Sequence, residues 1–192
     1  GLSYTNFVWE VSDVTMDTAT LTASSKLTVN VKVTNTGSYA GKDVVELYYS
    51  APYTPGKTEK SHVVLGDFAK TKTLRPSESQ TLTLSLTGYD MASYDATDKD
   101  GDGHKGYELD SGTYTFYVGK DAHDAWKNGH SSTVSLASDV NIDKDPTTGA
   151  DIKNLFDSST AEMKDHVLSR NDWEGTFPKA PTEDDLCRGE AF

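Results

Sequence analysis

Cysteine, long apolar runs and the usual catalytic loop motifs are scarce or missing in this sequence. The single cysteine, Cys187, excludes a disulfide framework and gives a cysteine-based zinc site too few ligands. No apolar run approaches the roughly 20 residues that span a bilayer. No phosphate-binding glycine loop and no GxSxG element occurs. These absences count against secreted miniproteins, helical membrane proteins, nucleotide-binding enzymes and serine hydrolases.

Positive charge is also in short supply. Eighteen Lys and Arg residues stand against 30 Asp and Glu residues, which gives a formal net charge of -12 and a pI near 4.7. An acidic surface repels DNA, RNA and anionic membranes, so we expect no nucleic acid and no membrane as partner. The lack of disulfides and of a visible leader favours a cytoplasmic location, with secretion under a signal outside this segment as the alternative.

The clearest structural signal lies between Leu27 and Tyr49. Its first half places apolar side chains at every second position, at Leu27, Val29, Val31 and Val33, with polar residues between them. This period of two is typical of a strand with one face in a core and the other in water. Asn-Thr-Gly then interrupts the run, and a second strand-like segment follows from 43 to 49. The two segments are expected to form an antiparallel pair or neighbouring strands of a sandwich.

Short strand-like segments continue on both sides of this pair. They are separated by turns and show no helical period. We expect seven or so strands, including 4–14, 81–86, 113–118 and 131–140, with an irregular edge between 62 and 74 and a corner at 89–94. This pattern predicts an all-β antiparallel sandwich over residues 1–140.

The composition changes after residue 140. Residues 141–192 hold 12 acidic and 6 basic side chains, so this short segment carries half of the net charge. Ser159 and Glu162 fit a capping box, which predicts one short helix near 158–169. We therefore expect residues 141–192 to be an acidic linker or extension that lies along the sandwich or on another domain.

One loop has the spacing of a metal site. Asp98, Asp100 and Asp102 alternate before Gly103, as carboxylates do at positions 1, 3 and 5 of a calcium loop, and the carbonyl of His104 would be the ligand at position 7. Position 12 breaks the match, because it is Leu109 with an acidic residue on either side. The sequence thus leaves two possibilities, a Ca²⁺ site or a solvated Asp/Gly loop.

Aromatic residues suggest a second type of site. Side chains that could stack on a sugar ring occur at Tyr48, Tyr49, Tyr53, Trp126 and Trp173. Tyrosines in strands more often pack against neighbouring strands, so a sugar-binding face is the less favoured interpretation.

Several motifs, in order along residues 1–120, resemble the fibronectin type III-like domain of family 3 glycoside hydrolases, most of which are β-glucosidases. Gly1-Leu2-Ser3-Tyr4-Thr5 resembles the end of the family's FGYGLSYT junction. The segments VTNTG at 33–37 and VVELY at 44–48 resemble its V-x-N-T-G and VVQLY core. Further similar segments are LGDF at 65–68, LRPSES at 74–79, with Ser77 where the family usually has Gly, and GYEL at 106–109.

This resemblance implies an immunoglobulin/fibronectin type III-like sandwich whose partners are the catalytic domains of the same polypeptide. The segment from Asp145 to Thr176 is similar to the connector in family members whose domain order is permuted, so that the catalytic barrel follows the module. Asp172 stands in Asn-Asp-Trp, which is similar to the family's nucleophile motif, but it lacks the apolar strand before it. The resemblance therefore assigns no catalytic residue to this chain; the parent would be a retaining β-glucosidase and the fragment alone inactive.

Two functions remain at this point. The first is a non-catalytic accessory domain that stabilises the arrangement of catalytic domains. The second is a carbohydrate-binding module, with or without assistance from calcium at Asp98, Asp100 and Asp102. Oligosaccharide binding by the chain would separate them.

Overall fold

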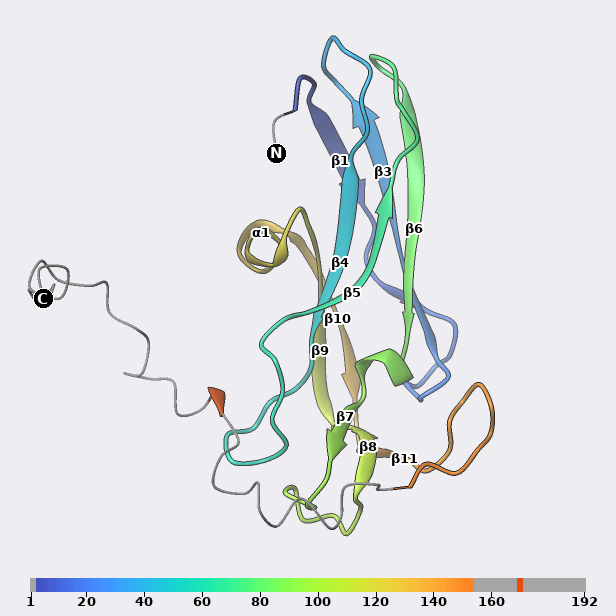
Figure 1. Cartoon of the computed structure of the whole chain (residues 1–192), viewed down its shortest axis with the longest axis vertical. Coiled ribbons are helices and arrows are strands. Elements are labelled where there is room, and N and C mark those ends of the chain that lie inside the picture. Colours follow the sequence, from blue (N-terminus) through green and yellow to red (C-terminus); the bar gives the residue numbers. More distant parts are fainter. Residues whose placement is uncertain (1–2, 154–168, 171–192) are drawn as a thin grey trace, which may run out of the picture.

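The computed structural model describes residues 3–153 and 169–170. Two antiparallel sheets pack face to face along the long axis of the molecule, and a smaller sheet lies at one end of them (Figure 1). The all-β sandwich predicted from the sequence is confirmed.

Strand β3 (Lys26–Asn35) is the centre of the first sheet. It pairs with β1 (Phe7–Val11), β2 (Thr15–Met16) and β6 (Ser79–Thr87), all antiparallel. Its register with β6 sets Leu27 opposite Leu86 and Val29 opposite Leu84. Because these cross-strand pairs are apolar and lie on one face of the sheet, that face packs against the core.

The second sheet has the order β10-β9-β4-β5. Its strands are β4 (Val44–Ser50), β5 (Val64–Lys70), β9 (Gly112–Gly119) and β10 (His130–Leu136). Strands β3 and β4, which follow each other in the chain, lie in different sheets. Of the two expected arrangements, the antiparallel pair is therefore wrong and the pair of sandwich strands is right.

The core lies between the inner faces of the two sheets. The alternating residues of β3 are all buried, with Leu27, Val31 and Val33 fully so. From the second sheet, Tyr114 and Phe116 of β9 fill the same space. Burial of this layer supplies the main stabilising free energy of the fold, at about 25 cal/mol per Å² of apolar surface.

The end of the sandwich differs from the expectation. A three-stranded sheet with the order β11-β8-β7 forms there from β7 (Ser93–Asp95), β8 (Gly106–Leu109) and β11 (Val140–Ile142), after the 3₁₀ turn η1 (Tyr89–Met91). The single last strand expected at 131–140 is thus two strands, because the chain leaves the second sheet after Leu136 and enters the small one at Val140.

Helix α1 (Ala122–Asn128) was not expected. Asp121 caps it by accepting a hydrogen bond from the backbone N–H of Asp124 at 2.8 Å, and the helix packs against β9 and β4. At seven residues it is too short to display an apolar period, although its capping residue was visible. Within the described part of the chain, no helix is long and apolar enough to cross a membrane.

The chain continues to contact the sandwich beyond β11. Lys144 and Asp151 form an isolated β-bridge, and Ile152 packs against the core. The helix expected near 158–169 falls outside the described residues, apart from Ser169. The division of the chain at residue 140 stays a prediction.

Candidate functional site

Acidic side chains gather at the end of the sandwich that carries the small sheet. Strands β7 and β8 meet there with the loop at 51–63 and with the loop at 96–105 that joins the two strands (Figure 1). The loop at 96–105 contains the carboxylates that the sequence singled out as calcium ligands.

The three predicted carboxylates do converge. One oxygen from each of Asp98, Asp100 and Asp102 lies within 4.8 Å of the other two. Backbone N–H groups hold the loop in this shape: Gly103 donates to Asp98 at 3.0 Å, and His104 donates to Asp102 at 2.6 Å. Gly103 has a φ of +90°, the left-handed conformation expected of it. Hydrogen bonds from Asn141 and from the His104 N–H lower the pKa of Asp102.

His104 was expected to contribute its backbone carbonyl. Its imidazole faces other groups: Nε2 lies 3.3 Å from the carbonyl oxygen of Tyr107, and Nδ1 lies 3.7 Å from Asp143. Whether this loop binds calcium stays a prediction.

The structure adds two carboxylates that sequence reasoning did not select, Asp95 and Glu108. Asp95 ends β7 and Glu108 lies in β8, and each is only 2% exposed. One oxygen from each of Asp95, Asp100 and Glu108 lies within 4.8 Å of the others, so Asp100 belongs to both groups. The acidic position next to Leu109 was the available signal for Glu108, but its burial depends on the pairing of β7 with β8 and on the loop that covers them.

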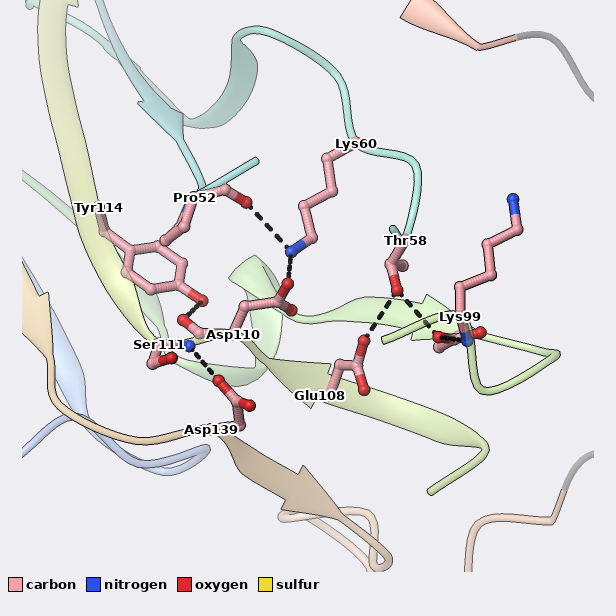
Figure 2. A network of polar contacts seen from close by, with 10 residues as sticks. Pro52, Thr58, Lys60, Lys99, Glu108, Asp110, Ser111, Tyr114 and Asp139 are labelled. Carbon is pink, nitrogen blue, oxygen red and sulfur yellow. Dashed lines mark hydrogen bonds and ion pairs between the residues drawn. The ribbon is translucent and has the colours of Figure 1, made fainter. Parts of the chain in front are cut away.

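A lysine shares this buried region (Figure 2). Lys60, with a side chain 5% exposed, forms an ion pair with Asp110 and donates a hydrogen bond to the carbonyl oxygen of Pro52 at 3.1 Å. The phenol of Tyr114 donates to the carbonyl oxygen of Asp110 at 3.1 Å. The ammonium thus balances the charge of Asp110, whose side chain is 18% exposed.

Thr58 links the other two buried carboxylates. Its Oγ1 lies 3.0 Å from Asp95 Oδ2 and 3.1 Å from Glu108 Oε1 (Figure 2). Burial, more than the negative charges of Asp110, Asp100 and Asp95, raises the pKa of Glu108 from 4.5 to about 7, against the lowering effect of the Thr58 hydrogen bond. Oε2 of Glu108 has no hydrogen-bond partner among the described residues.

The candidate sugar-stacking residues do not form one face. Tyr48 and Tyr49 are buried, Tyr48 donating to Glu46 and Tyr49 to the carbonyl oxygen of Asp90. The guanidinium of Arg170 lies over the ring of Tyr53, 3.7 Å from its centre. Trp126 is exposed, with the His62 imidazole against it edge to face. Trp173 lies outside the described residues.

The side chains gathered at this end of the molecule offer carboxylate oxygens, the type of ligand that hard cations prefer. It cannot perform acid–base chemistry on a sugar with Asp95 and Glu108, because no substrate reaches carboxylates buried to this degree. Asp172, to which the sequence assigned no catalytic role, is not among the described residues.

The sandwich is similar to segments of known proteins. The family model described as "Fibronectin type III-like domain" matches residues 43–122. The chain is 42% identical over 125 residues to a β-glucosidase of Ruminococcus albus and 39% identical over 135 residues to β-glucosidase A of Butyrivibrio fibrisolvens. Each alignment covers 65% of this chain.

The chain is short relative to these proteins. It spans 12% of the length of the Ruminococcus relative and 16% of the Butyrivibrio one. Among solved structures, a β-glucosidase from Paenibacillus barengoltzii matches with a TM-score of 0.62 and 43% identity, over 72% of this chain and 15% of that one. The similarity therefore concerns one β-sandwich segment of much longer chains.

Proposed function

Because the chain carries a fibronectin type III-like domain of the kind found in β-glucosidases, we propose that it is the non-catalytic accessory domain of a β-glucosidase-type glycoside hydrolase. In this role the sandwich stabilises the arrangement of the catalytic domains of the same polypeptide. Those domains supply the catalytic nucleophile and the catalytic acid, and the sandwich is a rigid, non-catalytic support for them.

The observation that carries this proposal is a buried asparagine at the end of the sandwich opposite the carboxylates. Asn35 is fully buried, and both the oxygen and the nitrogen of its side-chain amide form hydrogen bonds. Its Oδ1 accepts hydrogen bonds from Thr5 Oγ1 at 2.7 Å and from the Gly37 N–H at 3.0 Å. Its Nδ2 donates to the carbonyl oxygens of Tyr39 at 2.8 Å and Leu74 at 2.9 Å. One side chain thus joins the segment before β1 to the turns after β3 and before β6.

The close approach at this point explains the Asn-Thr-Gly motif. A Cβ atom at Gly37 would lie 2.1 Å from Thr5 Oγ1 and 2.7 Å from the Asn6 nitrogen, so only glycine allows the contact. The segment that contains Thr5 is therefore held at a fixed angle to the sandwich. A domain joined to that segment would be held in a fixed orientation as well.

Two tyrosines next to the hydrogen-bond network of Asn35 support contact with another domain. Tyr4 is 85% exposed and Tyr39 is 67% exposed, and each adjoins the Asn35 network. Exposed aromatic side chains on a rigid base are common at the centres of protein interfaces, because they bury much area at little cost in conformational entropy.

The proposal is tested by Tyr39→Ser in the complete hydrolase polypeptide that carries this domain. We expect a lower thermal transition of the complete protein and faster thermal loss of β-glucoside hydrolysis, with the transition of the 192-residue chain unchanged. Phe68→Ser is the matched control, since Phe68 is 64% exposed on β5, in the other sheet. Equal effects of the two substitutions, or none from Tyr39→Ser, would contradict the proposed docking surface.

The 192-residue chain alone is expected to be inactive on a chromogenic β-glucoside. The carbohydrate-binding alternative is addressed by calorimetric titration of the same chain with gluco-oligosaccharides, in which we expect no saturable heat. Saturable binding that Trp126→Ala abolishes would favour the alternative.

A further inference from the structure

We propose that a calcium ion binds between Asp95, Asp100 and Glu108, where β7, the loop at 96–105 and β8 meet. One oxygen from each residue lies within 4.8 Å of the other two, and Asp95 and Glu108 are almost completely buried. An ion that contacts its ligands at 2.3–2.6 Å can bridge oxygens up to about 5 Å apart, which matches this spacing.

An unpartnered buried oxygen points to a ligand at this place. Glu108 Oε2 is enclosed and has no hydrogen-bond partner in the described part of the chain. Leaving a buried carboxylate oxygen unpaired is costly, and an unpaired group of this kind calls for an ion, a water or a proton.

The hydrogen-bond count leads to the same need. Thr58 has one hydroxyl hydrogen, yet its oxygen lies within 3.1 Å of carboxylate oxygens of both Asp95 and Glu108. The hydroxyl can donate to only one of them at a time. Asp95 also accepts hydrogen bonds from the backbone N–H groups of Thr97 at 2.9 Å and Lys99 at 2.6 Å. When Thr58 donates to Asp95, Glu108 is therefore the carboxylate that is left without a donor.

The local charges favour a cation. The ammonium of Lys60 bonds to Asp110 and to the carbonyl oxygen of Pro52. Asp95 and Glu108 therefore remain as buried carboxylates that this lysine does not contact in any hydrogen bond or ion pair. A divalent ion with carboxylate ligands compensates both, and hard oxygen ligands of variable number are those that Ca²⁺ prefers.

Asp100 also belongs to the group with Asp98 and Asp102, in which only Asp102 is exposed, but that group has less need of an ion. Asp98 accepts the Gly103 N–H, and Asp102 accepts from both His104 and Asn141. These hydrogen bonds shape the loop, and Asp102 is exposed. In the buried pair, by contrast, Glu108 Oε2 has no hydrogen-bond partner among the residues that the structure describes.

The test is calorimetric titration of the 192-residue chain with CaCl₂ after removal of metals by EDTA, with MgCl₂ as a parallel titrant. We expect one calcium ion per chain and a higher thermal transition in calcium than in EDTA. Glu108→Gln keeps the shape of the side chain and removes its charge, so it should weaken calcium binding at least tenfold. Asp98→Asn is the matched control and should change the affinity less than threefold.

Asp95→Asn provides a second variant with the same expected loss, should Glu108→Gln fail to fold in EDTA. Two results would overturn the proposal. Wild-type protein with no calcium heat and no difference between calcium and EDTA would mean that a proton on Glu108 satisfies the site. Binding lost in Asp98→Asn and retained in Glu108→Gln would place the ion among Asp98, Asp100 and Asp102 instead.

Discussion

Replacing Lys60 by methionine removes the ammonium from the buried region and keeps the length of the side chain. In the folded protein this substitution leaves Asp110 buried without its cation and close to Glu108, whose pKa the charge of Asp110 already raises. Loss of one partner of a buried ion pair costs about 3–5 kcal/mol, because the remaining charge is not compensated. The side chains of Lys60 and Asp110 are only 5% and 18% exposed, so the pair lies in this regime.

The expected loss is measured by urea unfolding of the 192-residue chain in EDTA, followed by circular dichroism. The double variant Lys60→Met with Asp110→Asn should recover most of the loss, since it removes both charges.

An exposed ion pair in the same molecule gives the control. Lys32 lies 2.8 Å from Glu10, with side chains 49% and 69% exposed. Lys32→Met should cost less than about 1 kcal/mol. The reasoning is refuted if Lys60→Met is no more destabilising than Lys32→Met, or if Asp110→Asn restores nothing.

Three further predictions concern the same chain. In EDTA, the free energy of unfolding should fall by about 2–3 kcal/mol as the pH rises from 5 to 8, because burial raises the pKa of Glu108 from 4.5 to about 7 and the folded state therefore binds the proton more tightly. Glu108→Gln should remove this pH dependence in urea titrations at several pH values. Asn35→Ala should lower the free energy of unfolding in urea by about 3 kcal/mol, since it leaves the buried partners of Asn35, such as Thr5 Oγ1 and the Leu74 carbonyl, unpaired. A loss below about 1 kcal/mol would show that the Asn35 network contributes little to stability. Phe116→Ala in the core should cost about 3–5 kcal/mol by the same method, whereas Phe68→Ala on the surface should be nearly neutral; similar values for both would be inconsistent with the described core.

Local patterns predicted the parts of this fold that depend on single strands. The alternation from Leu27 to Val33 identified which side chains of β3 are buried, because a strand points successive side chains to opposite faces. The spacing of Asp98, Asp100 and Asp102 predicted their convergence, because a tight loop brings alternate residues together. Both predictions needed only neighbours in the chain.

Local patterns did not predict which strands pair with each other. The period of two says which face of β3 and β4 is apolar, and it does not say whether the two strands share a sheet. Helix α1 was missed because seven residues are too few for an apolar period.

The sequence by itself determined an all-β chain with a buried face on β3 and an acidic loop after β7. Only the tertiary structure decided that Asp95, Glu108 and Lys60 meet in one buried region. In the sequence nothing distinguishes these three from other charged residues, and Lys60 and Glu108 are 48 positions apart. They become a site because β7 pairs with β8 and because the loop at 51–63 covers that pair, so that water is removed from charges that no local pattern marks as buried.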